Sequence, residues 1–113
     1  MKKILIPVIC LLLAACGTSH ALMPVPYDIE YGKVLYPGIT IEDLNAGRDI
    51  FIANCSACHP LKNPLKRTTE EWNNIVPKMV SNVNRKADSV AINAEQQQLL
   101  LQYLVTLTNS RGK

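Results

Sequence analysis

The chain has 113 residues, enough for one small domain, with 12 Lys and Arg against 9 Asp and Glu. Two of the basic residues, Lys2 and Lys3, precede an apolar leader, and the remaining 10 basic and 9 acidic residues nearly balance. This balance excludes the strongly basic surface that nucleic-acid binding or a polybasic membrane patch would need.

The first 15 residues predict an export signal. Lys2 and Lys3 precede the apolar run from Ile4 to Leu13, which is too short to span a bilayer comfortably. The following Leu13-Ala14-Ala15-Cys16 resembles the lipobox of bacterial lipoproteins, in which cleavage leaves the cysteine as an acylated N-terminus. We therefore expect a signal peptide over residues 1–15 and a lipid on Cys16, since several acyl chains anchor a protein stably. In the alternative, cleavage is of the ordinary kind and Cys16 has no role.

This reading predicts a location in the bacterial cell envelope, facing the periplasm and anchored to the outer or inner membrane. Residues 16–39 contain Pro24, Pro26, Pro37 and Gly38 among scattered aromatic residues. Such a stretch predicts an extended tether between the lipid and the domain. Tyrosine side chains are expected to pack part of the tether onto the domain surface.

Residues 40–113 predict an all-α domain with three main helices and no strand. Each helix begins at a capping-box pair: Thr40 with Asp43, Thr68 with Glu71, and Asn93 with Gln96. Apolar residues recur at helical spacing in all three segments, including Leu44, Gly47 and Phe51 in the first and Leu100, Tyr103, Leu104 and Leu107 in the last. We expect Pro77 to kink the second helix, because proline removes a backbone donor there.

Between the first two helices stands Cys55-Ser56-Ala57-Cys58-His59. The C-x-x-C-H pattern is the attachment signature of c-type haem. The two thiols can each form a thioether to a haem vinyl group, and His59 can reach the iron from the same side. With Cys10 inside the leader and Cys16 lipidated, no thiol remains for a disulfide or a zinc site, which needs about four ligands. The predicted cofactor is one covalent haem c.

The second axial ligand of the iron is less strongly specified. Met79 shares an apolar helix face with Trp72 and Ile75, and it is the favoured candidate. A methionine on such a face is ordinarily a core residue, and that alternative stays open. His20 and Met23 in the tether are weaker alternatives. Candidate partners for the haem propionates are Lys66, Arg67 and the indole N–H of Trp72.

The chain resembles a single-haem, class I-like cytochrome c over roughly residues 39–107. The matching residues are Gly47-x-x-x-Phe51 shortly before Cys55, and Tyr103-Leu104 in the last helix. The resemblance implies three main helices wrapped around the haem. It also implies that the first and last helices cross closely at the glycine, with aromatic residues packed around the crossing.

The resemblance further implies that the second ring nitrogen of His59 donates to a backbone carbonyl in the loop around Pro64. The spacing of Trp72 and Met79 before a capped final helix is similar to that in small haem domains serving molybdenum sulfite dehydrogenases and quinohaemoprotein amine dehydrogenases.

These features predict a membrane-anchored carrier that passes single electrons between redox protein partners. Nothing in the sequence resembles a substrate pocket or an acid–base pair, so the chain alone is not expected to be an enzyme. One alternative is the haem subunit of a periplasmic dehydrogenase complex. Another is a haem-based ligand binder or sensor with an open sixth position, which requires that Met79 is not a ligand. A third is a haem with a purely structural role.

Overall fold

The structure, a computed structural model, describes residues 22–55, 63–87 and 90–112, with Cys55 described by its backbone alone. These residues form four α-helices and two short helical turns and contain no strand, so the predicted all-α class is confirmed for them. The elements are α2 (Pro26–Leu35), α3 (Ile41–Ile50), the π-helical turn η1 (Phe51–Cys55), the 3-10 turn η2 (Pro64–Lys66), α4 (Thr69–Ala87) and α5 (Ala94–Arg111).

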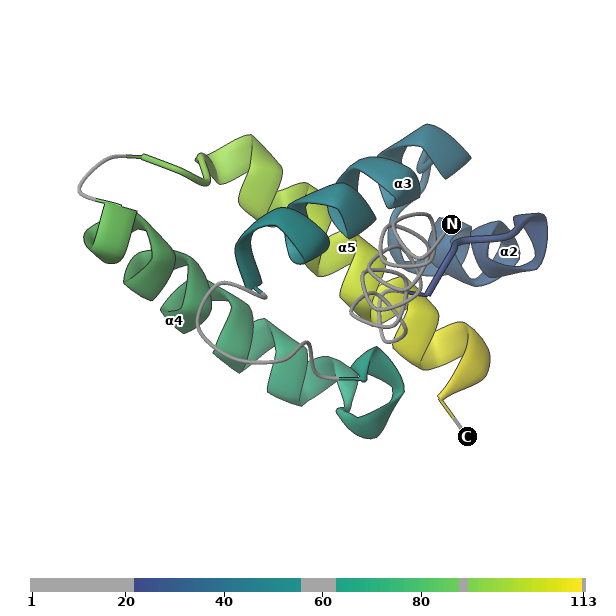
Figure 1. Cartoon of the computed structure of the whole chain (residues 1–113). Helices are drawn as coiled ribbons and strands as arrows, with labels where there is room; N and C mark the ends of the chain where they lie inside the picture. Colours follow the sequence, from purple (N-terminus) through teal and green to yellow (C-terminus); the bar gives the residue numbers. More distant parts are fainter. Residues whose placement is uncertain (1–21, 56–62, 88–89, 113) are drawn as a thin grey trace, which may run out of the picture.

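Helix α5 is the centre of the fold, because α2, α3 and α4 all pack against it (Figure 1). Five consecutive residues of α5, from Tyr103 to Leu107, are buried. The large side chains of Phe51 and Trp72 complete the same core from η1 and α4. The core of the described chain is therefore a single cluster organised along one helix.

The three predicted helix starts are confirmed. In each capping box the side chain of the first residue accepts from the backbone N–H of the residue three positions later. The side chain of that later residue accepts in turn from the backbone N–H of the first, and all these distances are 2.8–3.1 Å. The pairs are Thr40 with Asp43, Thr68 with Glu71, and Asn93 with Gln96. Pro77 lies inside α4, which remains one helical element over its whole length.

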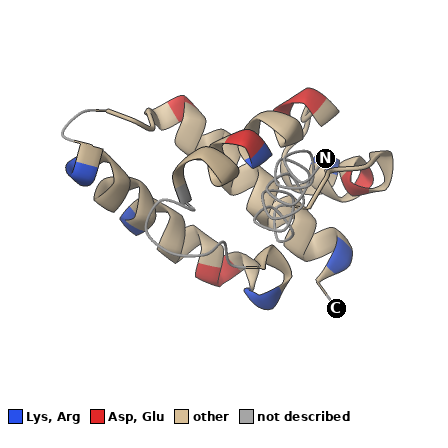
Figure 2. Ribbon diagram, viewed as in Figure 1, with Lys and Arg blue, Asp and Glu red and all other residues tan. Residues whose placement is uncertain are grey.

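Charged residues are placed to suit the helix dipoles. Every α-helix has an acidic residue in its first turn and a basic residue in its last (Figure 2). Negative charge near the N-terminus and positive charge near the C-terminus stabilise a helix by about 0.3–1 kcal/mol each at exposed positions. Local electrostatics thus favours all four helices.

The extended conformation expected for residues 16–39 is wrong for Pro26–Leu35, which form α2. Pro26 occupies the first helical position, where its missing N–H costs nothing. Asp28 then accepts from the Val25 N–H at 2.8 Å and caps the helix start. Gly38, with φ of 90°, supplies a left-handed residue in the turn before α3.

Helix α2 is attached to the end of α5 through a buried carboxylate. Asp28 accepts from Arg111 Nη2 at 2.5 Å and Nε at 3.0 Å, and from the Ser110 hydroxyl. Arg111 Nη2 also donates to the Met23 carbonyl at 2.9 Å. Burial alone would raise the pKa of Asp28, but the hydrogen bonds from Arg111, Ser110 and the Val25 N–H outweigh it and lower the pKa. Asp28 is thus held as a carboxylate.

Candidate functional site

Helices α3 and α5 cross in close contact at Gly47. A Cβ atom at this position would collide with the Leu99 carbonyl oxygen and would lie 2.6 Å from Tyr103 Cβ. Only glycine allows the two backbones to approach this closely. One turn further on, the rings of Phe51 and Tyr103 pack with their centroids 6.1 Å apart. The close crossing and the surrounding aromatic residues expected at Gly47 are both present.

The chain leaves this crossing through η1, a π-helical turn that ends at Cys55. Within it, Asn54 Nδ2 donates to the Ile50 carbonyl at 3.0 Å. A π turn holds one more residue than an α turn, and such turns are frequent at functional sites. The buried Phe51 fixes the start of the turn in the core. The backbone that leads into the C-x-x-C-H motif is therefore firmly positioned.

The motif itself lies outside the described residues. Cys58 and His59 fall in the undescribed segment 56–62, and nothing is described of the Cys55 side chain. Cys16 and His20 also lie outside the described residues. The predicted haem attachment and lipidation consequently remain predictions.

Met79 lies on the inner face of α4, half-buried and packed against the core. At about 100° per residue, Met79 and Ile75 occupy one edge of the apolar face, and Val76 and Val80 occupy the other. Val76 and Val80 are buried. The thioether is therefore placed at the margin of the core. Met23, the alternative in the tether segment, is more than half exposed beside α2.

Several half-buried apolar side chains from the elements that flank the motif pack against the same core. Each packs against the core while keeping part of its surface uncovered: Ile50, Ile52, Leu65, Ile75, Met79 and Val83. They come from α3, η1, η2 and α4, the elements on both sides of the segment carrying the motif. A large flat porphyrin gains stability by covering apolar surface. These residues, together with the thiols, imidazole and thioether in the sequence, fit a haem c.

The indole of Trp72 is turned into the fold. Its N–H donates to the Pro64 carbonyl and to Thr108 Oγ1, both at 3.1 Å, and Thr108 Oγ1 lies 2.8 Å from the same carbonyl. Trp72 is therefore not a propionate donor, contrary to expectation. A carbonyl has two lone pairs, and both of those on Pro64 are engaged. The single Thr108 hydroxyl proton is shared between this carbonyl and the Arg67 carbonyl, at 3.2 Å. His59, the donor expected in this loop, lies outside the described residues.

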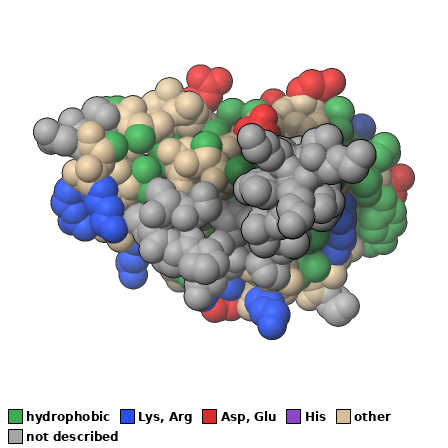
Figure 3. Space-filling model, in the orientation of Figure 1, with side chains coloured by type: hydrophobic (Ala, Val, Ile, Leu, Met, Phe, Trp, Pro, Cys, Tyr) green, Lys and Arg blue, Asp and Glu red, His purple; other side chains and the backbone are tan. Residues whose placement is uncertain are grey.

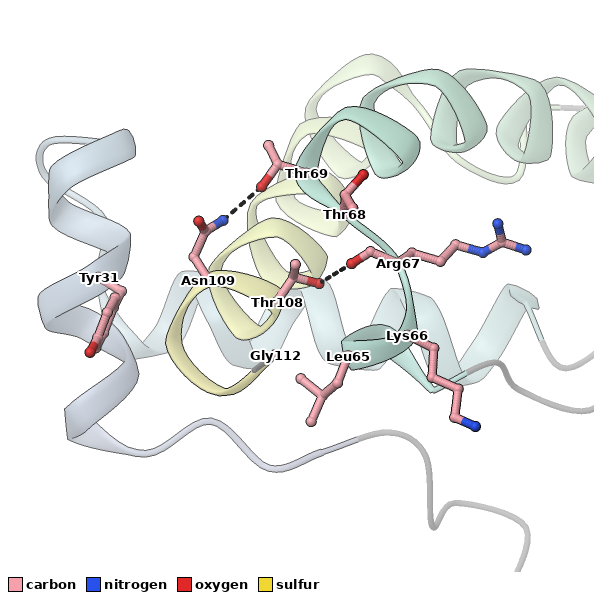
Figure 4. A pocket seen from close by; sticks show the side chains of 9 residues that line it. All are labelled: Tyr31, Leu65, Lys66, Arg67, Thr68, Thr69, Thr108, Asn109 and Gly112. Atoms are coloured by element: carbon pink, nitrogen blue, oxygen red, sulfur yellow. Dashed lines mark hydrogen bonds between the residues drawn. The ribbon is translucent and has the colours of Figure 1, made fainter.

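Lys66 and Arg67, the other propionate candidates, border a pocket of about 520 Å³ between η2 and the end of α5. Their side chains extend away from Thr108 and Asn109 (Figure 4). Arg67 pairs with Glu71 at 3.4 Å, and the polar groups of Thr108 and Asn109 are hydrogen bonded to Arg67 O and Thr69. The polar side chains of Arg67, Thr108 and Asn109 at this pocket thus already have partners within the protein.

Two further features bear on the site. Within residues 22–55, 63–87 and 90–112, no three His, Cys, Asp or Glu side chains gather as a metal site would require. None of the helices in this part of the chain is both long and apolar enough to cross a membrane. Comparisons with protein-family models, with curated proteins and with solved structures gave no match.

Proposed function

We propose that this protein is a lipid-anchored c-type cytochrome that carries single electrons between redox proteins of the bacterial cell envelope. The observation that carries the proposal is the position of Cys55-Ser56-Ala57-Cys58-His59. The motif starts at the last residue of a π turn, and this turn directly follows α3, the helix that crosses α5 at Gly47. A haem attached there would lie against the half-buried apolar residues of η1, η2 and α4.

In this proposal each site residue has one role. Cys55 and Cys58 bind the haem through thioethers, and His59 holds the iron on one side. Met79 supplies the thioether ligand on the other side from the margin of the core. The bound iron supplies the redox chemistry by alternating between its ferrous and ferric states. Histidine and methionine together favour a higher reduction potential than two histidines.

In this proposal the protein supports electron transfer in two ways. It excludes water from the apolar side of the haem, and it keeps the positions of the iron ligands constant. Phe51, Trp72 and Val76 are almost fully buried in the core against which the half-buried apolar residues pack. A rigid apolar surrounding changes little between oxidation states, so little reorganisation accompanies each transfer. Partners would meet the exposed haem edge through a small interface, as is usual for transient redox encounters.

The test is covalent haem on the purified full-length protein, produced in a host with a c-type maturation system. We expect haem to stay with the polypeptide through denaturing electrophoresis, and Cys55→Ala combined with Cys58→Ala to abolish it. Cys10→Ala, a change in the leader outside the motif, is the matched control and should leave haem attachment unchanged. Loss of haem from the unmodified protein on denaturation would refute the proposal.

The spectrum of the same sample separates electron carrier from ligand binder. A low-spin spectrum, with slow reaction of the reduced protein with carbon monoxide, is expected for the carrier. A high-spin spectrum with rapid carbon monoxide binding would instead favour a sensor with an open sixth position. Co-purification of a molybdenum or quinone-cofactor enzyme would favour a haem subunit of a dehydrogenase complex.

A further inference from the structure

Helix α2 turns its large apolar side chains towards solvent, the opposite of what a helix that packs on a core usually does. The residues facing α5 are Asp28 and Gly32, both buried. Large apolar side chains point outward instead, with Val34 81% and Tyr27 55% exposed. Six of the seven exposed large hydrophobic residues of the described chain lie between Met23 and Leu35. Such a cluster of exposed apolar side chains indicates that another surface covers them.

The outward residues form one continuous stripe. At about 100° per residue, Tyr27, Tyr31, Val34 and Leu35 fall within about 100° of the helix circumference. We name these four residues the α2 stripe. Hydrophobic side chains gather over α2 at the right edge of the molecule (Figure 3). Leu35, at one edge of the stripe, borders Asp28 on the docked face, whereas Tyr27, Tyr31 and Val34 lie further round the helix. The stripe can therefore contact another phase while Asp28 and Gly32 stay docked on α5.

The chemistry of the stripe suits the interface of a phospholipid bilayer. The rings of Tyr27 and Tyr31 pack at a tilt of 59° with centroids 5.3 Å apart, and their hydroxyl groups are hydrogen bonded at 2.9 Å. Tyrosine presents an apolar body and a polar tip, which is why it is enriched where membrane and water meet. Val34 and Leu35 add aliphatic surface that would enter the apolar layer.

The position of the stripe along the chain identifies the membrane as its occupant. Leu22 is fixed to the domain, because its carbonyl accepts from the Tyr103 hydroxyl at 2.8 Å. Cys16 precedes Leu22 by six residues, which span at most about 20 Å when fully extended. An acylated Cys16 therefore keeps Leu22, four residues before α2, within that distance of the bilayer. Met23 and Val25, both exposed, continue the apolar surface towards the anchor.

We infer that the α2 stripe lies on the phospholipid surface and orients the domain relative to the membrane that holds the lipid anchor. This inference rests on the proposed lipidation of Cys16 but not on the haem. Glu30 and Lys33 are the exposed charges of α2, and they cancel. Contact with the bilayer is consequently hydrophobic, and it requires neither anionic lipid nor low salt.

The test places a spin label at Val34→Cys in the full-length lipoprotein, reconstituted in phosphatidylcholine vesicles. The matched control is Val90→Cys, because Val90 is also an exposed valine, at 74%, but lies between α4 and α5. We measure how often the label collides with oxygen, which enters the bilayer, and with a water-soluble nickel complex, which does not. The ratio of the oxygen rate to the nickel rate should be several-fold higher at position 34 than at position 90. The ratio at position 34 should persist in high salt.

Equal, water-like ratios at both positions would overturn the inference. A label at position 34 that neither reagent reaches would also overturn it, by indicating contact with a protein. The intact mass of the same sample counts acyl chains, haem and label. A mass with acyl chains but no haem contradicts the cytochrome proposal, and it leaves the thiols of Cys55 and Cys58 free to react with the label. The membrane contact is then measured with Cys55→Ala and Cys58→Ala added to both labelled proteins. A mass without acyl chains overturns the anchor and this inference together.

Discussion

Gly47 and Tyr103 are in such close contact that one additional methyl group has no room between them. A Cβ atom at position 47 would lie 2.6 Å from Tyr103 Cβ and would also meet the Leu99 backbone. We expect Gly47→Ala to lower the free energy of unfolding by about 1–3 kcal/mol, the usual cost of overpacking. This loss should appear despite the gain of about 1 kcal/mol that alanine brings to a helix. Chemical denaturation followed by circular dichroism measures it.

Gly32→Ala is the matched control for this change. It is also a buried helical glycine, but its Cβ would meet only side-chain atoms of Ile39 and Thr106, at 3.2–3.3 Å. These side chains can shift by a few tenths of an ångström, so we expect a much smaller effect. Equal losses in the two variants would show that the crossing at Gly47 is not specially tight.

Asp28→Asn should weaken the attachment of α2 to α5. The amide cannot form the ion pair with Arg111, and its NH2 group leaves two donors without an acceptor. These are Ser110 Oγ and Arg111 Nε in one orientation of the amide, and Arg111 Nη2 and the Val25 N–H in the other. We expect a loss of about 1–3 kcal/mol, the cost of leaving a buried polar group unsatisfied. Hydrogen exchange should then be faster in α2 than in α3. Glu30→Gln, which removes an exposed carboxylate from the same helix, should have little effect.

The same pair predicts a pH dependence. The folded protein lowers the pKa of Asp28, so its contribution to stability is complete above the ordinary aspartate pKa of about 3.9 and is lost as the pH falls through the lower, folded value. The stability difference between the unmodified protein and Asp28→Asn should therefore shrink below about pH 4. A difference that stays constant down to pH 2 would argue against a carboxylate at this position.

Trp72→Phe removes the indole N–H together with part of the buried ring. Since the N–H donates to Pro64 O and Thr108 Oγ1 and the smaller ring leaves a cavity, we expect a loss of at least about 1 kcal/mol. Combination with Thr108→Val should be non-additive by at least about 0.5 kcal/mol, because the two side chains share one network. Combination with Ser81→Ala, at an exposed position of α4, should be additive. Additivity in both combinations would contradict the network.

Met79→Leu separates the two roles open to Met79. If the side chain only packs, leucine should be tolerated at a cost below about 1.5 kcal/mol and the spectrum should not change. As the proposed ligand, its loss should remove the weak far-red sulfur-to-iron band of the ferric protein and lower the reduction potential. Met23→Leu is the control and should change neither. An unchanged band in Met79→Leu would exclude Met79 as the ligand.

Local signals explain why three helices could be predicted and α2 could not. Thr40, Thr68 and Asn93 each stand three residues before their capping partner, and such signals act within one turn. Helix α2 instead buries Asp28 and exposes valine and leucine, so its polarity contradicts the usual pattern. The available sign was Pro26 at the first helical position, followed two residues later by an acid that caps Val25.

Some of the surroundings of the candidate site could be predicted from the sequence, and some could not. The contact at Gly47 follows from a short motif, and it is present. The role of Trp72 depends on Thr108, which is 36 residues away, and no local pattern encodes that pairing. The π turn before Cys55 was also missed, because one extra residue per turn leaves no mark in the composition of Phe51–Cys55.

The contacts at the start of the described chain also determine how mechanical load would travel through the molecule. The carbonyls of Leu22 and Met23 and the carboxylate of Asp28 are all bound by side chains of α5. A pull applied through the N-terminal segment would therefore reach the central helix directly. Because Tyr103, which holds Leu22, also contacts Gly47 and Phe51, the same pull would load the crossing of α3 and α5 that precedes Cys55.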